Sequence, residues 1–201
     1  MAAVALLALA GCAATPSAPA AAPAAATAPS PAPAAAPWST SPAEPGDRVA
    51  APSRVRLASL DVDVEVVDVG VDDRGEMEVP QDVSTVGWYR FGPRPGAAAG
   101  SAVLSGHVDD RVQGEGAFHR LSELIPGDPV EVELADGAVV AYVVDRVRRI
   151  AKEELPVDEL FARDGAPVLT LVTCGGDFDR EARSYRENVV VTASPTGDGA
   201  A

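Results

Sequence analysis

Apolar and polar residues alternate through much of the chain after about residue 52, and this period of two is typical of strands with one buried face. The clearest example lies within residues 54–71, where valines occupy positions 62, 64 and 66 and acidic residues occupy positions 61, 63 and 65. We therefore interpret residues 54–71 as a half-buried strand.

Four further segments have strand-like patterns. Residues 101–110 begin with a short apolar run that ends at Gly106, and residues 166–174 form a continuous apolar run, which is typical of a strand buried on both faces. Residues 128–150 contain two alternating runs around Asp136-Gly137, a strong hairpin signal. Residues 188–194 form the last apolar run.

Helical patterns are confined to residues 117–124 and 157–163, each long enough for about two turns. Many short strands with glycine and proline at the joints predict a mainly β domain, either a closed barrel or a sandwich, with one or two short helices. Valine, leucine and alanine must build its core, because the chain has only four phenylalanines, three tyrosines and two tryptophans.

Composition divides the chain into four parts. Residues 1–11 are an apolar run, interpreted as a signal peptide or membrane-targeting segment, and residues 12–50 are an Ala/Pro-rich spacer that we expect to be disordered. Residues 51–195 form the folded domain, and residues 196–201 form a disordered tail. The first run ends in "LAGC", which resembles a bacterial lipobox and implies lipid attachment to Cys12. Because no lysine or arginine precedes it, the alternative is an upstream start that extends the run into a membrane anchor.

Charge and spacing exclude several classes of site. A formal net charge of −14 and a pI near 4.4 argue against nucleic acid binding. The two cysteines and two histidines lack the spacing of a structural zinc site, and the acidic residues around Gly75 do not match a calcium loop. No phosphate-binding loop or dinucleotide motif occurs. We therefore expect neither a metal nor a cofactor.

Three residues at or beside predicted strand ends carry candidate chemistry. Cys174 is the single cysteine of the folded part, His107 follows the run that ends at Gly106, and Arg186 precedes the last strand. A thiol nucleophile needs a base for its proton and a donor for the developing oxyanion, and imidazole and guanidinium groups supply both. The structural alternatives are a packed cysteine, a structural histidine and an arginine in a surface ion pair.

Other residues of the same types are weaker candidates. His119 lies in the helical pattern 117–124, and we interpret it as a surface or packing residue. Arg183 is the alternative to Arg186, but it lies in residues 179–183, which we expect to form a loop. Trp88 and Tyr89 are aromatic residues of a kind that usually packs in strands, so we leave them out of the site.

The motifs around these residues resemble those of the sortases. "TLVTC" matches the sortase cysteine signature, "SGHVD" matches the segment around the catalytic histidine, and an arginine follows the cysteine by 12 residues in "SYRENVVV". Together with "VGWYRFGPRPG" and "FHRLSELIPGD", these segments look most like the actinobacterial class F sortases. The resemblance extends from about Val55 to Ala193.

This resemblance implies a closed eight-stranded β-barrel and a cofactor-independent cysteine transpeptidase. It implies that Cys174 attacks the Thr–Gly bond of a Leu-Pro-X-Thr-Gly-like sorting signal to form a thioester, and that His107 protonates the leaving amine. Arg186 would bind the oxyanion or the substrate backbone, and Thr173 would shape the substrate groove. A cell-wall amine would then resolve the thioester.

The resemblance also sets expectations for partners and location. The chain would be a monomer outside the cytoplasm, held at the cell surface by a membrane anchor or by a lipid on Cys12, and would act on exported proteins. One alternative is a hydrolase that resolves the same acyl-enzyme with water. Another is a non-catalytic surface lipoprotein that binds peptides.

Overall fold

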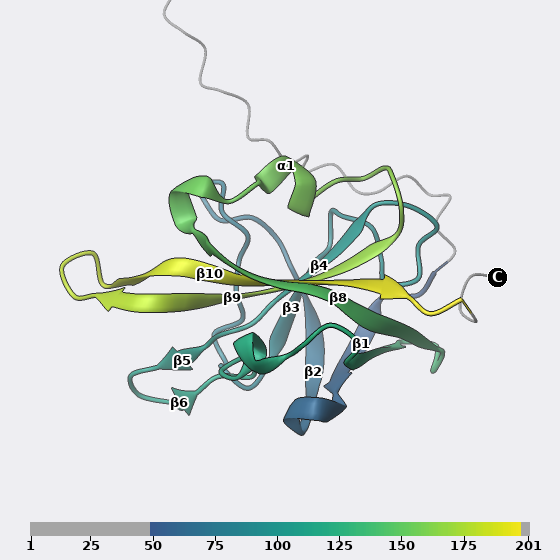
Figure 1. Ribbon diagram of the computed structural model, residues 1–201, viewed down its shortest axis with the longest axis horizontal. Coiled ribbons are helices and arrows are strands. Elements are labelled where there is room, and N and C mark those ends of the chain that lie inside the picture. Colours follow the sequence, from purple (N-terminus) through teal and green to yellow (C-terminus); the bar gives the residue numbers. More distant parts are fainter. Residues whose placement is uncertain (1–48, 198–201) are drawn as a thin grey trace, which may run out of the picture. The chain divides into compact units, whose positions relative to one another are not determined.

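A computed structural model describes residues 49–197, and these residues form a closed barrel (Figure 1). The barrel has the strand order β1-β2-β3-β4-β9-β10-β8-β7, and pairing of β1 with β7 closes it. Its strands are β1 (Pro52–Leu57), β2 (Val62–Val69), β3 (Val86–Tyr89), β4 (Ser101–Ser105), β7 (Pro129–Leu134), β8 (Val139–Ala151), β9 (Val168–Asp179) and β10 (Ser184–Pro195). The prediction of a mainly β, eight-stranded barrel is confirmed.

Residues 54–71 do not form the single strand that we expected. The 3-10 helix η1 (Ala58–Leu60) interrupts them, so β1 and β2 become neighbouring antiparallel strands. Asp61 follows η1 in the left-handed conformation, with φ at 56°, and reverses the chain direction. The apolar residues change from odd positions in β1, at Val55 and Leu57, to even positions in β2, at Val62 and Val64, and this change of parity coincides with the turn.

The predicted hairpin over residues 128–150 is confirmed. Strands β7 and β8 pair in antiparallel register, and Gly137 has φ at +86° in the turn between them. The last two strands are longer than the sequence pattern predicts, because β9 continues past Cys174 and β10 starts at Ser184. Figure 1 shows β9 and β10 extending together as a ribbon beyond the barrel, at the left of the view.

Helical structure is shorter than predicted. Residues 157–163 give the four-residue helix α1 (Val157–Leu160), and residues 117–124 give only the 3-10 helix η2 (Leu121–Glu123). The amides of Ala117 and Phe118 donate to the carbonyls of Val83 and His107, and these bonds tie the segment to other parts of the chain before a helix can start. A third 3-10 helix, η3 (Lys152–Glu154), directly follows β8.

The core lies inside the barrel and is built mainly of valine and leucine, as the composition predicts. Its fully buried members include residues from β1, β4 and β9: Val55, Leu57, Leu104, Leu169 and Leu171. Because side chains alternate between the two faces of a strand, Leu169 and Leu171 fix the face of β9 that points inward. The side chain of Cys174 therefore lies on the opposite, outer face of β9.

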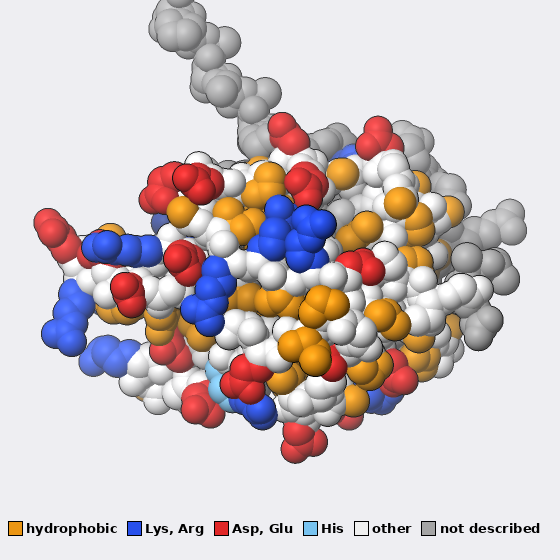
Figure 2. All heavy atoms as spheres, in the orientation of Figure 1, with side chains coloured by type: hydrophobic (Ala, Val, Ile, Leu, Met, Phe, Trp, Pro, Cys, Tyr) orange, Lys and Arg blue, Asp and Glu red, His pale blue; other side chains and the backbone are white. Residues whose placement is uncertain are grey.

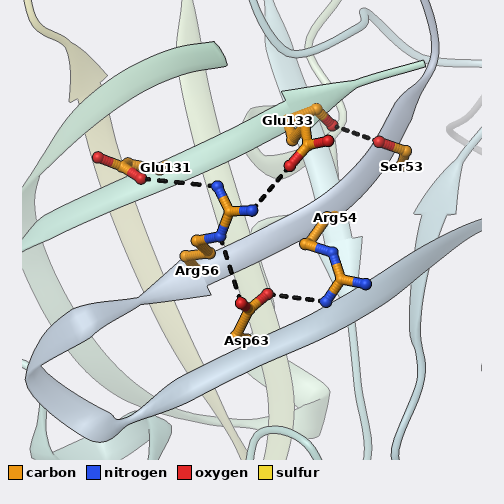
Figure 3. Close-up of polar contacts among 6 residues, drawn as sticks. All are labelled: Ser53, Arg54, Arg56, Asp63, Glu131 and Glu133. Atoms are coloured by element: carbon orange, nitrogen blue, oxygen red, sulfur yellow. Dashed lines mark hydrogen bonds and ion pairs between the residues drawn. The ribbon is translucent and has the colours of Figure 1, made fainter. Parts of the chain in front are cut away.

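A cluster of charged residues covers the outer faces of β1, β2 and β7 (Figure 3). Arg56 lies at its centre and bonds Asp63 on β2 and Glu133 on β7, at 3.3 and 2.8 Å, with Glu131 at 4.0 Å. Arg54 pairs with the same aspartate at 2.8 Å. Exposed ion pairs contribute only about 0–1 kcal/mol each, so we assign this cluster a role in strand register rather than in chemistry.

The ends of the domain make a few contacts beyond the predicted boundaries of 51 and 195. Val49 and Ala50 pack against the core, and the amide of Thr196 donates to the carbonyl of Ala141 at 2.9 Å. The predicted leader 1–11 and most of the spacer 12–50, including Cys12, lie outside the described residues, as does most of the predicted tail. Within residues 49–197, no helix has the length and hydrophobicity needed to cross a lipid bilayer.

We expect Leu171→Ala to lower the free energy of unfolding by about 2–5 kcal/mol, because the removed atoms leave a cavity in the core. Urea denaturation followed by circular dichroism measures this loss. The matched control is Val172→Ala on the opposite face of β9, where the side chain is only half-buried and the loss should be clearly smaller. Equal losses for the two variants would contradict the assigned facing of β9.

Candidate active site

The parallel pairing of β4 with β9 brings two of the predicted site residues to the same end of the barrel. Ser105 is the register partner of Val172, and the amide of Gly106 donates to the carbonyl of Val172 at 3.1 Å. His107 and Cys174 each lie two residues further along their strands, so the register carries the imidazole to the level of the thiol. Because the two strands run in the same direction, His107 just past the end of β4 lies level with Cys174 inside the longer β9.

Thr173 fastens the two strands together directly before the cysteine. Its hydroxyl donates to the carbonyl of Gly106 at 2.7 Å, and the side chain is buried. This bond joins the residue before Cys174 to the residue before His107. Thr173 therefore fixes the separation of the two groups, and the suggestion that it also shapes a substrate groove stays a prediction.

The imidazole of His107 has a defined hydrogen-bond partner. Its Nε2 lies 2.8 Å from the carbonyl oxygen of Pro80, and a carbonyl can only accept, so Nε2 carries the proton and Nδ1 is the basic nitrogen of the neutral ring. The backbone of His107 is held by Gly116, where a Cβ would lie 2.2 Å from the His107 oxygen. Only glycine permits this close approach, which folds the following loop back onto the histidine.

The thiol of Cys174 is half-buried, and its surroundings favour the neutral form. Burial raises its pKa above the ordinary value for cysteine, the positive charge of Lys152 acts in the opposite direction, and the negative charge of Asp109 raises it further. These surroundings therefore favour the thiol over the thiolate, which is the nucleophilic form of cysteine.

Asp109 and Tyr185 form a contact beside the thiol that links two hairpins. Asp109 lies on β5 (Asp109–Asp110), which pairs with β6 (Gly114–Glu115), and its carboxylate accepts a 2.6 Å hydrogen bond from the hydroxyl of Tyr185 on β10. This bond and partial burial raise the pKa of Tyr185 to about 12, so the hydroxyl stays protonated. The contact holds the segment after His107 against the strand that carries Arg186.

Arg186 lies on β10, at a bulge in the β9–β10 pairing. Tyr185 is paired with Phe178 and Glu187 with Gly175, so two residues of β9 lie opposite Arg186 alone. Its guanidinium donates to the carboxylate of Asp179 at 3.1 Å and is 67% exposed. Arg186 therefore lies near the end of the site, but its side chain is paired with Asp179 and not with Cys174.

The contacts of the weaker candidates indicate structural roles. The Nδ1–H of His119 donates to the carbonyl of Gly116 at 2.9 Å, and its Nε2 lies 3.5 Å from Glu115. Arg183 has φ at 52° in the β9–β10 turn. Trp88 is buried and donates its indole N–H to the carbonyl of Pro93 at 3.1 Å. In the described part of the chain, no group of three or more histidine, cysteine, aspartate and glutamate side chains is arranged to hold a metal ion.

Sequence reasoning did not single out Asp109, Lys152 or Asp179. Asp109 lies within the "SGHVD" motif, and Tyr185 directly precedes Arg186, so the motifs contained both residues without indicating their contact. Lys152 lies outside every quoted motif. Figure 2 shows basic and acidic side chains interspersed over the β9–β10 ribbon at the left of the view, which agrees with mixed charges around this end of the barrel.

We expect Thr173→Val to lower the free energy of unfolding by about 1–3 kcal/mol, because it leaves the carbonyl of Gly106 without the buried hydroxyl donor. Thr173→Ser keeps the hydroxyl and serves as the control. Chemical denaturation of both variants measures the difference. A valine variant as stable as the serine variant would show that the bond does not fasten β4 to β9.

We expect Asp109→Asn to lower the pKa of Cys174, because it removes a negative charge that opposes the thiolate. Alkylation of Cys174 by iodoacetamide near neutral pH should then be about two- to tenfold faster. Tyr185→Phe is the matched control, because it removes the hydrogen bond and keeps the carboxylate. Equal acceleration in the control would assign the effect to the lost contact instead of the charge.

Comparison with known proteins places this arrangement in a family. The model of the sortase domain matches residues 55–196. The fold is similar to sortase C1 from Streptococcus agalactiae, with a TM-score of 0.55 and 16% identity over 73% of this chain and 67% of that one. It is also similar to sortase C-1 from Actinomyces oris, with a TM-score of 0.52 and 23% identity over 72% of each chain.

A third similar structure is sortase A from Corynebacterium diphtheriae, with a TM-score of 0.52 and 16% identity over 74% of this chain. The match spans 61% of that protein's chain. Comparison with curated protein sequences gives no significant match. The family match covers most of the sequence, and the barrel is the one found in these structures. The chain therefore belongs to the sortase family of cysteine transpeptidases.

Proposed function

We propose that this sortase is of the class F type and cleaves a Leu-Pro-X-Thr-Gly-like sorting signal of exported proteins between threonine and glycine. The observation that carries the proposal is the register of β4 and β9, which brings His107 to the level of Cys174. A thiol beside an imidazole is the minimal arrangement for forming and resolving a thioester. The quoted motifs around both residues support the class and the type of signal.

In the acylation step, Nδ1 of His107 takes the proton of Cys174 as the sulfur attacks the threonine carbonyl carbon. This assignment follows from the bond of Nε2 to Pro80, which leaves Nδ1 as the base. The tetrahedral intermediate collapses as the carbon–nitrogen bond breaks, and His107 returns the proton to the leaving glycine amine. The product of this step is a thioester between Cys174 and the threonine.

In the second step, an amine of the cell wall attacks the thioester carbonyl. His107 takes a proton from the attacking amine, and the sulfur leaves and is protonated again. The raised pKa of Cys174 makes the thiol, and not the thiolate, the resting form at both ends of the cycle. His107 is therefore needed as a base in both half-reactions.

Arg186 would stabilise the oxyanion of the tetrahedral intermediate or hold the substrate backbone. This role requires its guanidinium to exchange Asp179 for the substrate. An exposed ion pair contributes only about 0–1 kcal/mol, so the exchange has a low cost. The bulge opposite Arg186 gives the strand extra twist at the point where the side chain must turn toward the site.

The proposed setting is the outer surface of the cell. Residues 1–11 would direct export, a lipid on Cys12 or a membrane anchor would hold the protein, and residues 12–50 would separate the barrel from the membrane. Sorting signals and cell-wall amines are both available there. The barrel would act as a monomer.

We expect the full chain to cleave a peptide carrying a Leu-Pro-X-Thr-Gly-like signal and to join the threonine to an added glycine-based amine. Cys174→Ala and His107→Ala should each reduce the rate by at least about a thousandfold. Arg186→Lys should reduce kcat/KM by about ten- to a thousandfold, because a lysine lacks the forked donors. Mass spectrometry of the products identifies the bond that is cut.

The products distinguish the possible outcomes. Cleavage without ligation, across several amines, would favour a hydrolase with the same acyl-enzyme. Peptide binding that persists in Cys174→Ala without any cleavage by the native chain would favour a binding protein. Cleavage that survives Cys174→Ala would overturn the assigned nucleophile.

A further inference from the structure

The chain contains sixteen basic residues, of which fifteen are arginines and one is a lysine, Lys152. This single lysine lies at the start of η3, directly after β8. It is half-buried, and its Nζ donates to the hydroxyl of Ser184 on β10 at 2.7 Å. A lysine that lies in the site, in a chain that otherwise uses arginine, suggests a role that arginine does not fill.

Lys152 shares a surface pocket with Arg186. The pocket has a volume of about 610 Å³ and lies between η3 and the β9–β10 ribbon, with Ser184 and Tyr185 also in its wall. Strand β10 lies between η3 and the part of β9 that carries the thiol. Ala151, directly before Lys152, is the register partner of Glu187 on β10, and Glu187 is the partner of Gly175, directly after Cys174. Lys152 therefore approaches the thiol from the β10 side, whereas His107 approaches it from the β4 side.

The two cations of the pocket differ in their partners. Arg186 is paired with Asp179, and its charge is largely offset. Lys152 contacts the neutral hydroxyl of Ser184 and forms no ion pair among residues 49–197, although the carboxylates of Glu153, Asp179 and Glu187 line the same pocket. Its positive charge is therefore not offset by a direct carboxylate contact.

We propose that the ammonium group of Lys152 is a second cation of the active site, which stabilises the negative charge that forms on Cys174 when His107 takes its proton. The proposal rests on Cys174 being the nucleophile of the proposed function. Lys152 takes part in no proton transfer and forms no covalent bond. It acts only through the electrostatic effect of its charge on the thiol. The effect of Lys152 on the thiol opposes the effects of burial and of Asp109.

The difference between lysine and arginine explains the choice of residue. A guanidinium offers a planar fork that can bind a carboxylate with two bonds, as Arg74 and Arg120 do with Asp72 and Glu123. In a pocket with three carboxylates, such a group would be drawn into an ion pair and its charge would be partly offset. An ammonium is a compact charge on a flexible stem, and one bond to Ser184 holds it in place.

The charges around the thiol come from each neighbouring element. Asp109 on β5 disfavours the thiolate, and its own partner is the hydroxyl of Tyr185 on β10. Lys152 in η3 favours the thiolate, His107 after β4 accepts the proton, and Arg186 is paired with Asp179. Removal of the Lys152 ammonium should therefore leave Asp109 as the main charge that acts on the thiolate.

The test measures alkylation of Cys174 by iodoacetamide across neutral to alkaline pH, in the full chain and its Lys152→Met variant. Mass spectrometry of the peptide that contains Cys174 separates its reaction from that of Cys12. We expect Lys152→Met to shift the pH profile upward and to slow alkylation near neutral pH by about three- to tenfold, since one pKa unit corresponds to a tenfold change in thiolate. Lys152→Arg keeps the charge and should retain at least part of the native rate.

The matched control is Arg149→Met, which removes a positive charge from the exposed part of β8 three residues earlier and should leave the profile unchanged. A Lys152→Met profile that superimposes on the native one, in a variant with native thermal stability, would overturn the proposal. So would a folded Lys152→Arg variant as slow as Lys152→Met, because charge alone would then not account for the effect. Alkylation needs no sorting peptide, so failure of the transpeptidation assay leaves this result interpretable.

Discussion

The parallel pairing of β4 with β9 is the constraint on which the rest of the site depends. Most neighbouring strands of the barrel are antiparallel, whereas β4 and β9 run in the same direction, and β4 ends level with Val172 inside the longer β9. His107 lies two residues beyond the end of β4, and Cys174 lies two residues beyond Val172 on β9. The buried bond from Thr173 to Gly106 then removes the remaining freedom to slide. The relative position of His107 and Cys174 is thus set mainly by the pairing of these strands.

The surroundings of the thiol combine opposite requirements. Burial and Asp109 keep it protonated, which protects a cysteine outside the cytoplasm from oxidation, since the thiolate is the reactive form. Catalysis requires the opposite, a thiolate at the moment of attack. In the proposed mechanism, His107 on one side and the ammonium of Lys152 on the other favour the thiolate when a substrate carbonyl is present for it to attack. Because acidic residues outnumber basic ones and the net charge is −14, the position of each cation has a large effect on the local electrostatics.

The sequence predicted the barrel and the hairpin, and indicated the candidate site residues, because each has a local pattern. Alternation located the strands, Asp136-Gly137 located a turn, and short motifs located Cys174 and His107. Other features had no local pattern. The four residues of β3 are all buried and do not alternate. The bond between Tyr185 and Asp109 joins residues 76 positions apart, and Arg186 matches its motif although its side chain is paired with Asp179.

The register of β4 and β9 also has a consequence for when the enzyme becomes active. Ser101 and Val168 are partners although 67 residues separate them, so this pairing cannot form until nearly the whole domain is available. Pairings between residues so far apart in the sequence form slowly, because the entropic cost of closing the loop comes before any stabilising contact. A chain that lacks β9 therefore has neither a closed barrel nor the pairing that brings Cys174 to the level of His107. The candidate site is complete only once most of the domain has been made and has folded.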